Sequence, residues 1–133
     1  MVGAGPDRVD AGIMLQVLQI YLSAPVVAAR GFWRTLPDGL SKAELEAAYP
    51  PGSEAHNHVF TLLYFWETIG GLLKQGVLSE ELAFDTVLDA PPWPTIEQFV
   101  RDVRNERDEP REGENIEYAY ERAMKFAAER RSN

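Results

Sequence analysis

The sequence predicts an all-α fold: a single-domain bundle of five or six helices around one long central helix at about residues 53–75. Two observations support this class. Apolar residues recur at helical spacing along most of the chain, and no stretch alternates apolar and polar residues for more than a few positions. A length of 133 residues corresponds to one domain. We expect a flexible N-terminus, residues 1–9, and a single helical domain over residues 10–131.

The first helix is expected to begin near Asp10, a good N-cap, and to end near Ser23. Its polar residues Gln16, Gln19 and Ser23 form one narrow stripe, and the rest of its surface is apolar. Such a helix is either central in the fold or part of a subunit interface. Pro25 then interrupts the hydrogen-bond ladder, so a second helical piece should carry residues 26–33.

Residues 11–29 contain no charged side chain, and this length is close to that of a membrane span. The polar Gln16, Gln19 and Ser23 would be costly in hydrocarbon. The acidic residues that precede the segment also do not fit a signal peptide. We therefore expect a soluble first helix and a cytoplasmic protein, with a membrane anchor as the alternative.

The central helix is predicted from about Ser53 to Gln75, with Gly76 as its left-handed terminator. At 100° per residue, its apolar side chains fall in one arc: Ala55, Val59, Leu62, Leu63, Trp66, Ile69, Gly70 and Leu73. Gly70 in the middle of this arc indicates that another helix approaches closely there. The alternative is a tolerated glycine, which costs about 1 kcal/mol relative to alanine.

Shorter helices should surround this element. A capping box at Ser41 and Glu44 begins a helix that ends near Tyr49. Ser79 should cap a short helix through Val87. Two further helices are expected over residues 95–107 and 114–130, with an exposed loop between them.

Composition excludes several classes of function. The chain has no cysteine, which excludes disulfides, thiolate zinc sites and cysteine nucleophiles. A net charge of −8 argues against nucleic-acid binding. Residues 1–78 carry 7 acids and 5 bases, whereas residues 79–133 carry 14 acids and 8 bases. A cationic partner should therefore dock on the second half.

The run Tyr64-Phe65-Trp66-Glu67-Thr68-Ile69-Gly70-Gly71, followed by Gly76 and by Leu78-Ser79-Glu80-Glu81, resembles a bacterial helical family known only as domain of unknown function 4760. Trp93, Arg101 or Arg104, and Tyr118 or Tyr120 match later positions of its pattern. The resemblance covers about residues 20–130 and implies an all-helical domain with no established activity. It also implies that many relatives carry an extra N-terminal membrane helix, which we do not expect here.

Glu67 is the most informative ionisable residue, because it flanks the apolar arc of the central helix. A half-buried carboxylate needs a partner, and Arg30, Arg101 and Arg104 are the candidates. One interpretation is a structural ion pair that fixes helix register. The other is a ligand pocket. The candidate residues for either role are Glu67, Arg30, Arg104, Trp93 and Trp66.

No catalytic set and no cofactor motif is recognisable. Glu54 and His58 are weak metal-ligand candidates at i, i+4, but both histidines are expected on the solvated first turn, and we predict no metal.

The leading hypothesis is a non-enzymatic protein–protein interaction or regulatory module that forms a homodimer through residues 13–22. The second hypothesis is a small-molecule- or metal-binding protein with a pocket around Glu67, Arg104 and Trp93. One form of this hypothesis is a hydrolytic protein. The third is a peripheral membrane protein anchored by residues 11–29.

Overall fold

The computed structural model describes residues 5–132 and confirms the all-α class with one long central helix. No strand occurs in this range. Seven α-helices are present rather than the expected five or six, with the short α3 and α5 counted separately, and one π-helical turn accompanies them. They are α1 (Arg8–Tyr21), α2 (Ala24–Trp33), α3 (Lys42–Ala48), α4 (Glu54–Lys74), α5 (Glu80–Leu82), η1 (Ala83–Val87), α6 (Trp93–Arg107) and α7 (Glu114–Ser132).

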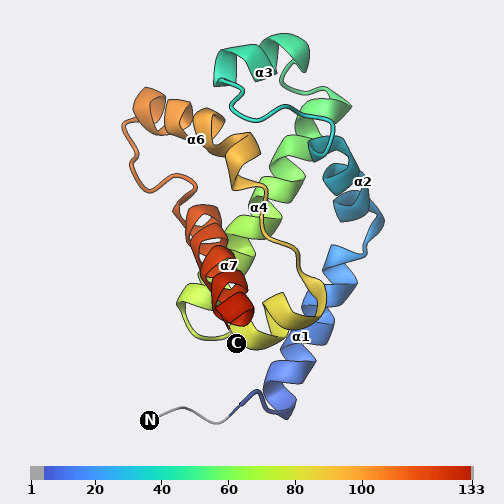
Figure 1. Ribbon diagram of the computed structural model, residues 1–133. Coiled ribbons are helices and arrows are strands. Elements are labelled where there is room, and N and C mark those ends of the chain that lie inside the picture. The colour runs from blue at the N-terminus through green and yellow to red at the C-terminus, as the bar shows by residue number, and fades with distance from the viewer. Residues whose placement is uncertain (1–4, 133) are drawn as a thin grey trace.

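Helix α4 runs through the middle of the molecule, with α2 packed along one part of it and α7 along another (Figure 1). The Ser53 hydroxyl caps the helix by accepting a hydrogen bond from the His56 N–H at 3.2 Å. Gly76, at φ 73°, ends it as predicted. Of the predicted apolar arc, all members are buried except Ala55, which is half-buried. The core therefore forms around this helix.

The predicted close approach at Gly70 is confirmed. The first turn of α7 crosses α4 at this point, and a Cβ atom on Gly70 would lie 2.5 Å from the carbonyl carbon of Asn115. Only a glycine allows the two helices to pack at this distance. The contact fixes where α7 begins relative to α4, and that position matters for the site described below.

Helix α1 begins at Arg8, and its N-cap is Asp7 rather than Asp10. The Asp7 carboxylate accepts from the Asp10 N–H, and Asp10 accepts from the Asp7 N–H in return, both at 2.9 Å. This reciprocal pair is available only when Asp10 is the third helical residue. Of the N-terminus predicted to be flexible, residues 1–4 lie outside the described part of the chain.

Helix α1 lies at the edge of the molecule (Figure 1). It buries only Met14, Val17 and Tyr21. Leu15 and Leu22 remain 62% and 60% exposed. No single helix in residues 5–132 is long and apolar enough to cross a membrane, whereas α1 and α2 together, bent by 67°, reach that length and composition.

Of the remaining helices, α3 and α6 lie toward the N-terminal end of α4, whereas α5 lies beyond its C-terminal end and contacts α1 (Figure 1). Helices α3 and α6 pack together, and the Lys42 N–H donates to the Asp102 carboxylate at 2.8 Å. The helix predicted over residues 79–87 is divided into α5 and the π-helical turn η1, in which the Leu88 N–H bonds to the Ala83 carbonyl at 2.9 Å. Helix α7 continues to Ser132, two residues beyond the predicted end.

Candidate functional site

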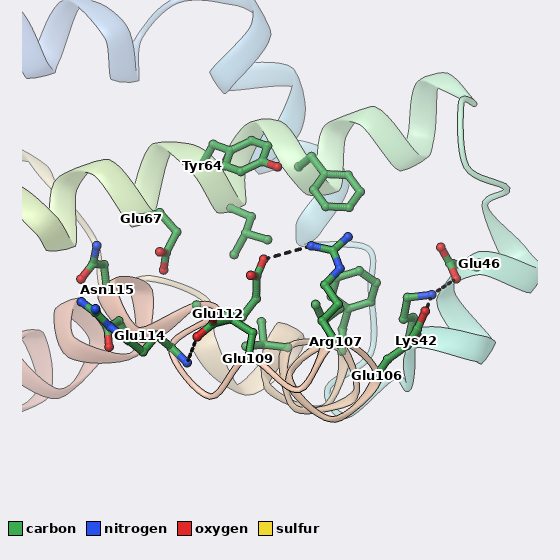
Figure 2. A pocket seen from close by; sticks show the side chains of 17 residues that line it. Lys42, Glu46, Tyr64, Glu67, Glu106, Arg107, Glu109, Glu112, Glu114 and Asn115 are labelled. Atoms are coloured by element: carbon green, nitrogen blue, oxygen red, sulfur yellow. Dashed lines mark hydrogen bonds and ion pairs between the residues drawn. The ribbon is translucent and has the colours of Figure 1, made fainter.

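A pocket of about 540 Å³ lies between α4, α3, α6 and the loop that joins α6 to α7 (Figure 2). Its floor is apolar and comes from Phe60, Leu63, Phe99, Val100 and Val103, beside the exposed Tyr64. Six glutamates also line it: Glu46, Glu67, Glu106, Glu109, Glu112 and Glu114. We call it the glutamate pocket. Its volume lies within the range of small-molecule sites.

Three basic side chains, Lys42, Arg107 and Arg111, also line the pocket, and each is already paired. Lys42 lies 2.7 Å from Glu46 and 3.2 Å from Glu106. Arg107 lies 3.6 Å from Glu112, and Arg111 lies 2.9 Å from Glu114. Six acids against three bases leave the pocket with a formal charge of −3.

Glu67 and Glu109 are the two glutamates of the pocket that have no ion-pair partner among the described residues. The Glu109 carboxylate accepts a hydrogen bond from the Arg111 backbone N–H at 3.1 Å. Its charge therefore faces the pocket without a neutralising cation.

Glu67 points from α4 toward the start of α7 (Figure 2). Its carboxylate accepts a hydrogen bond from the Ile116 backbone N–H at 2.8 Å. The first N–H groups of a helix have no partner within the helix, so Glu67 acts as an N-cap supplied by another helix. Gly113, which precedes α7, has no side chain that could do so.

The pKa of Glu67 is raised above its ordinary value. The largest cause is burial, which disfavours the charged form. The N–H groups of Ile116 and Asn115 oppose this shift, and the nearby charges of Glu112 and Glu114 add to it. A proton on Glu67 is therefore easier to retain than on a fully solvated glutamate.

Arg104 holds the α6–α7 loop in place behind the pocket. Its Nε donates to the Glu112 carbonyl at 2.6 Å, and its Nη2 donates to the Glu117 carboxylate at 2.8 Å. Gly113, at φ 71°, lies directly against Val100, where a Cβ atom would approach Val100 Cγ1 to 2.5 Å. The Arg104 hydrogen bonds and the contact of Gly113 with Val100 therefore hold the loop that carries Glu109 and Glu112 against α6.

The comparison with protein families agrees with this architecture. A family model described as a domain of unknown function, DUF4760, matches residues 14–123. The chain belongs to the DUF4760 family. The resemblance noted in the sequence is thereby confirmed. No curated protein matches this DUF4760 chain. No solved structure matches it either.

The structure separates the site residues that the sequence suggested for this DUF4760 domain. Glu67 lines the glutamate pocket, whereas Arg104 and Trp93 do not. The Arg104 Cζ lies 5.8 Å from the centroid of the Trp93 ring. Arg30 and Trp66 line a second cavity, of about 320 Å³. None of the three candidate arginines forms an ion pair with Glu67, and Arg101 instead pairs with Glu97 on the surface.

The histidines lie differently from the expectation of a solvated first turn. His56 is buried and packs against the Phe60 ring, with 4.9 Å between centroids. His58 is half-buried against Phe32, and its carbonyl accepts from the Trp33 indole N–H at 3.1 Å. Glu54 is exposed. Among residues 5–132, no group of three or more histidine, aspartate or glutamate side chains could hold a metal ion.

Sequence reasoning did not find the glutamate pocket itself. Arginines alternate with acidic residues between Arg101 and Arg111, a pattern typical of a solvated, salt-bridged face rather than of a pocket. The signal that pointed to the pocket was the acidic surplus of the second half of the chain. The aromatic floor could not be found, because Phe60 and Phe99 meet only through the packing of α4 against α6.

Proposed function

We propose that this DUF4760 domain is a non-enzymatic interaction module that binds a lysine- or arginine-containing segment of a partner protein in the glutamate pocket. The observation that carries this proposal is the charge of −3 that the pocket retains after its own bases are paired. The aromatic floor supports it. The apolar stems of Lys and Arg pack on such surfaces, and their charged heads are attracted to ring faces.

The test uses a short fluorescent peptide that alternates arginine and leucine, with a glutamate–leucine peptide of the same length as a charge control. Binding is measured by fluorescence anisotropy at low and at physiological salt. We expect the arginine peptide alone to bind. A Glu109→Gln, Glu112→Gln double variant should weaken this binding about fivefold or more, which corresponds to about 1 kcal/mol.

A matched variant separates the pocket from the general acidity of the chain. Glu121 and Glu129 lie on α7, are exposed and do not line the pocket. The Glu121→Gln, Glu129→Gln variant removes the same number of charges and should bind the peptide as the unaltered protein does. Equal losses in the two double variants would show non-specific attraction and would contradict the proposal.

A second candidate is self-association through α1 and the start of α2. Of eight large hydrophobic side chains that are exposed in the described chain, five lie here: Val9, Leu15, Ile20, Leu22 and Val27. Residues 11–29 carry no charge, so two chains of net charge −8 can meet at this face without direct repulsion. The occupant we propose is therefore a second copy of the chain.

Solution mass by size exclusion with light scattering tests this candidate. We expect a dimer, and we expect Leu22→Asp to give a folded monomer. The control is Val77→Asp, which places the same charge on a 46% exposed valine outside this face. Val17 is unsuitable for the test because it is buried. A monomer at every accessible concentration, or a dimer that survives Leu22→Asp, would contradict self-association through α1.

A further inference from the structure

A second cavity, of about 320 Å³, lies where α2 meets α4 and the segment before α6. We call it the arginine cavity. Its wall includes the aromatic rings of Tyr21, Trp33 and Trp66. Four charged side chains also line it: Arg30, Arg34, Asp38 and Asp89. Its volume lies at the lower end of the range for ligand sites, so it fits a small molecule.

Arg30 and Arg34 differ from most basic residues of this chain. Eight of the 13 form ion pairs with described carboxylates: Lys42, Lys74, Arg101, Arg104, Arg107, Arg111, Arg122 and Arg130. Arg30 and Arg34 form none, although the chain has an excess of acids. Among the residues described, neither guanidinium has a hydrogen-bond acceptor. Ten N–H donors at one cavity are thus free to bind an anionic group.

Tyr21 holds Arg30 in position. The Arg30 Cζ lies 3.9 Å from the centroid of the Tyr21 ring. A cation–π contact fixes the guanidinium through its face and leaves its N–H groups available. Burial raises the pKa of Tyr21, so the phenol stays neutral and does not compensate the arginine charge. The cavity therefore presents a positioned and unpaired cation.

The two aspartates of the cavity are also separated from the arginines. Neither Asp38 nor Asp89 forms an ion pair with Arg30 or Arg34, although all four side chains line the same space. One carboxylate oxygen of Asp38 instead accepts from the Thr95 hydroxyl at 2.9 Å. The cavity thus contains positive and negative groups that do not neutralise each other directly.

From this arrangement we infer that the arginine cavity binds a small zwitterion, a free α-amino acid. Its carboxylate binds the guanidinium groups of Arg30 and Arg34. Its ammonium group binds Asp38 and Asp89. The apolar wall with Trp33 and Trp66 receives the side chain. This site is distinct from the glutamate pocket, and neither proposal depends on the other.

The experiment measures tryptophan fluorescence and melting temperature of the full chain in the presence of each L-amino acid at millimolar concentration. We expect one or more apolar or aromatic amino acids to give a saturable response. Two matched probes, hydrocinnamate and phenethylamine, carry only the acid or only the amine of phenylalanine. We expect both to bind at least about tenfold more weakly than the best amino acid. Equal binding of hydrocinnamate would overturn the assignment of a zwitterion.

Variants connect the response to the cavity. Arg34→Gln alters an exposed side chain and should leave the fold intact, while Arg30→Gln also removes the contact with Tyr21. Both should weaken binding about tenfold or more. Arg8→Gln removes the same charge from a residue outside the cavity and should bind as the unaltered chain does. No response to any amino acid, or full binding by Arg34→Gln, would overturn the proposal.

Discussion

Gly70 and Asn115 are in direct backbone contact, although they lie on different helices. A Cβ atom on Gly70 would meet the carbonyl group of Asn115, and that carbonyl belongs to the first turn of α7 and cannot rotate away. Gly71, the next residue, also faces Asn115. Its Cβ would lie 3.4 Å from Nδ2 of the Asn115 side chain, which can move. Gly70 and Gly71 are adjacent, but only Gly71 has room for an added Cβ atom.

We therefore expect Gly70→Ala to destabilise the protein by about 3 kcal/mol or more, since α7 must shift along α4. Gly71→Ala should be neutral or stabilising by up to about 1 kcal/mol, because alanine favours the helix. Urea unfolding of the two variants measures both free energies. Similar stability for the two alanine variants would show that α7 does not pack against Gly70 as described.

The contribution of the Glu67 cap to stability can be measured by comparing two uncharged replacements of this residue. The Gln side chain keeps an oxygen that can accept from the Ile116 N–H, whereas Ala leaves this donor without a partner. We expect Glu67→Ala to be about 1–2 kcal/mol less stable than Glu67→Gln. Thermal and urea unfolding at neutral pH provide the comparison. No difference between them would mean that the cap contributes nothing to stability.

The raised pKa of Glu67 gives this residue a pH signature. A carboxyl group whose pKa is higher in the folded chain binds its proton more tightly there than in the unfolded chain. Its contribution is fully present below the unfolded value and is lost as pH rises through the folded value. The stability of the unaltered protein relative to Glu67→Gln should therefore fall as pH rises above the ordinary glutamate pKa of about 4.3. A relative increase in stability as pH rises through this range would contradict the shift.

Arg104 and Arg101 provide a comparison of a half-buried with an exposed arginine on the same helix. The Arg104 side chain is 15% exposed and binds both Glu112 and Glu117, whereas Arg101 is 50% exposed and binds Glu97. We expect Arg104→Met to cost about 1–3 kcal/mol, because it releases the α6–α7 loop. Arg101→Met should change stability by less than about 0.5 kcal/mol. Equal effects in urea unfolding would contradict the role assigned to Arg104.

Ser23 precedes α2 and Ser41 precedes α3, but only Ser41 caps the helix that follows it. The Ser41 hydroxyl accepts from the Glu44 N–H at 3.1 Å and completes a capping box, whereas the Ser23 hydroxyl donates to the Ile20 carbonyl of α1 and caps no N–H of α2. Ser41→Ala should lower stability by about 1 kcal/mol, and Ser23→Ala should change it by less than about 0.5 kcal/mol. Melting temperatures of both variants test this difference. A larger effect at Ser23 would contradict it.

Local patterns predicted the helices well, because helical spacing, caps and terminating glycines are properties of neighbouring residues. The buried arc of α4 and the close approach at Gly70 were both evident from the sequence. The N-cap of α1 was misplaced by three residues, since Asp7 and Asp10 are equally good caps when considered alone. The capping box between them determines which one begins the helix.

The partner of Glu67 could not be predicted in the same way. The sequence showed a half-buried carboxylate and several arginines, so an ion pair was the natural expectation. The actual partner, the Ile116 N–H, lies 49 residues away and belongs to the backbone, which every residue shares. His56 was misplaced for a related reason: its burial depends on how α3 and the Phe60 ring pack around it.

The packing of α7 on α4 at Glu67 and Gly70 also has a consequence while the chain is being translated. Translation proceeds from the N-terminus, so α4 is synthesised before Asn115 and Ile116 and cannot pack against them until they have followed it. Until then, the apolar side of α4 that α7 will cover faces solvent in a growing chain. A ribosome that stalls in the loop before α7 would therefore hold a product with an open hydrophobic surface, a typical substrate for chaperones.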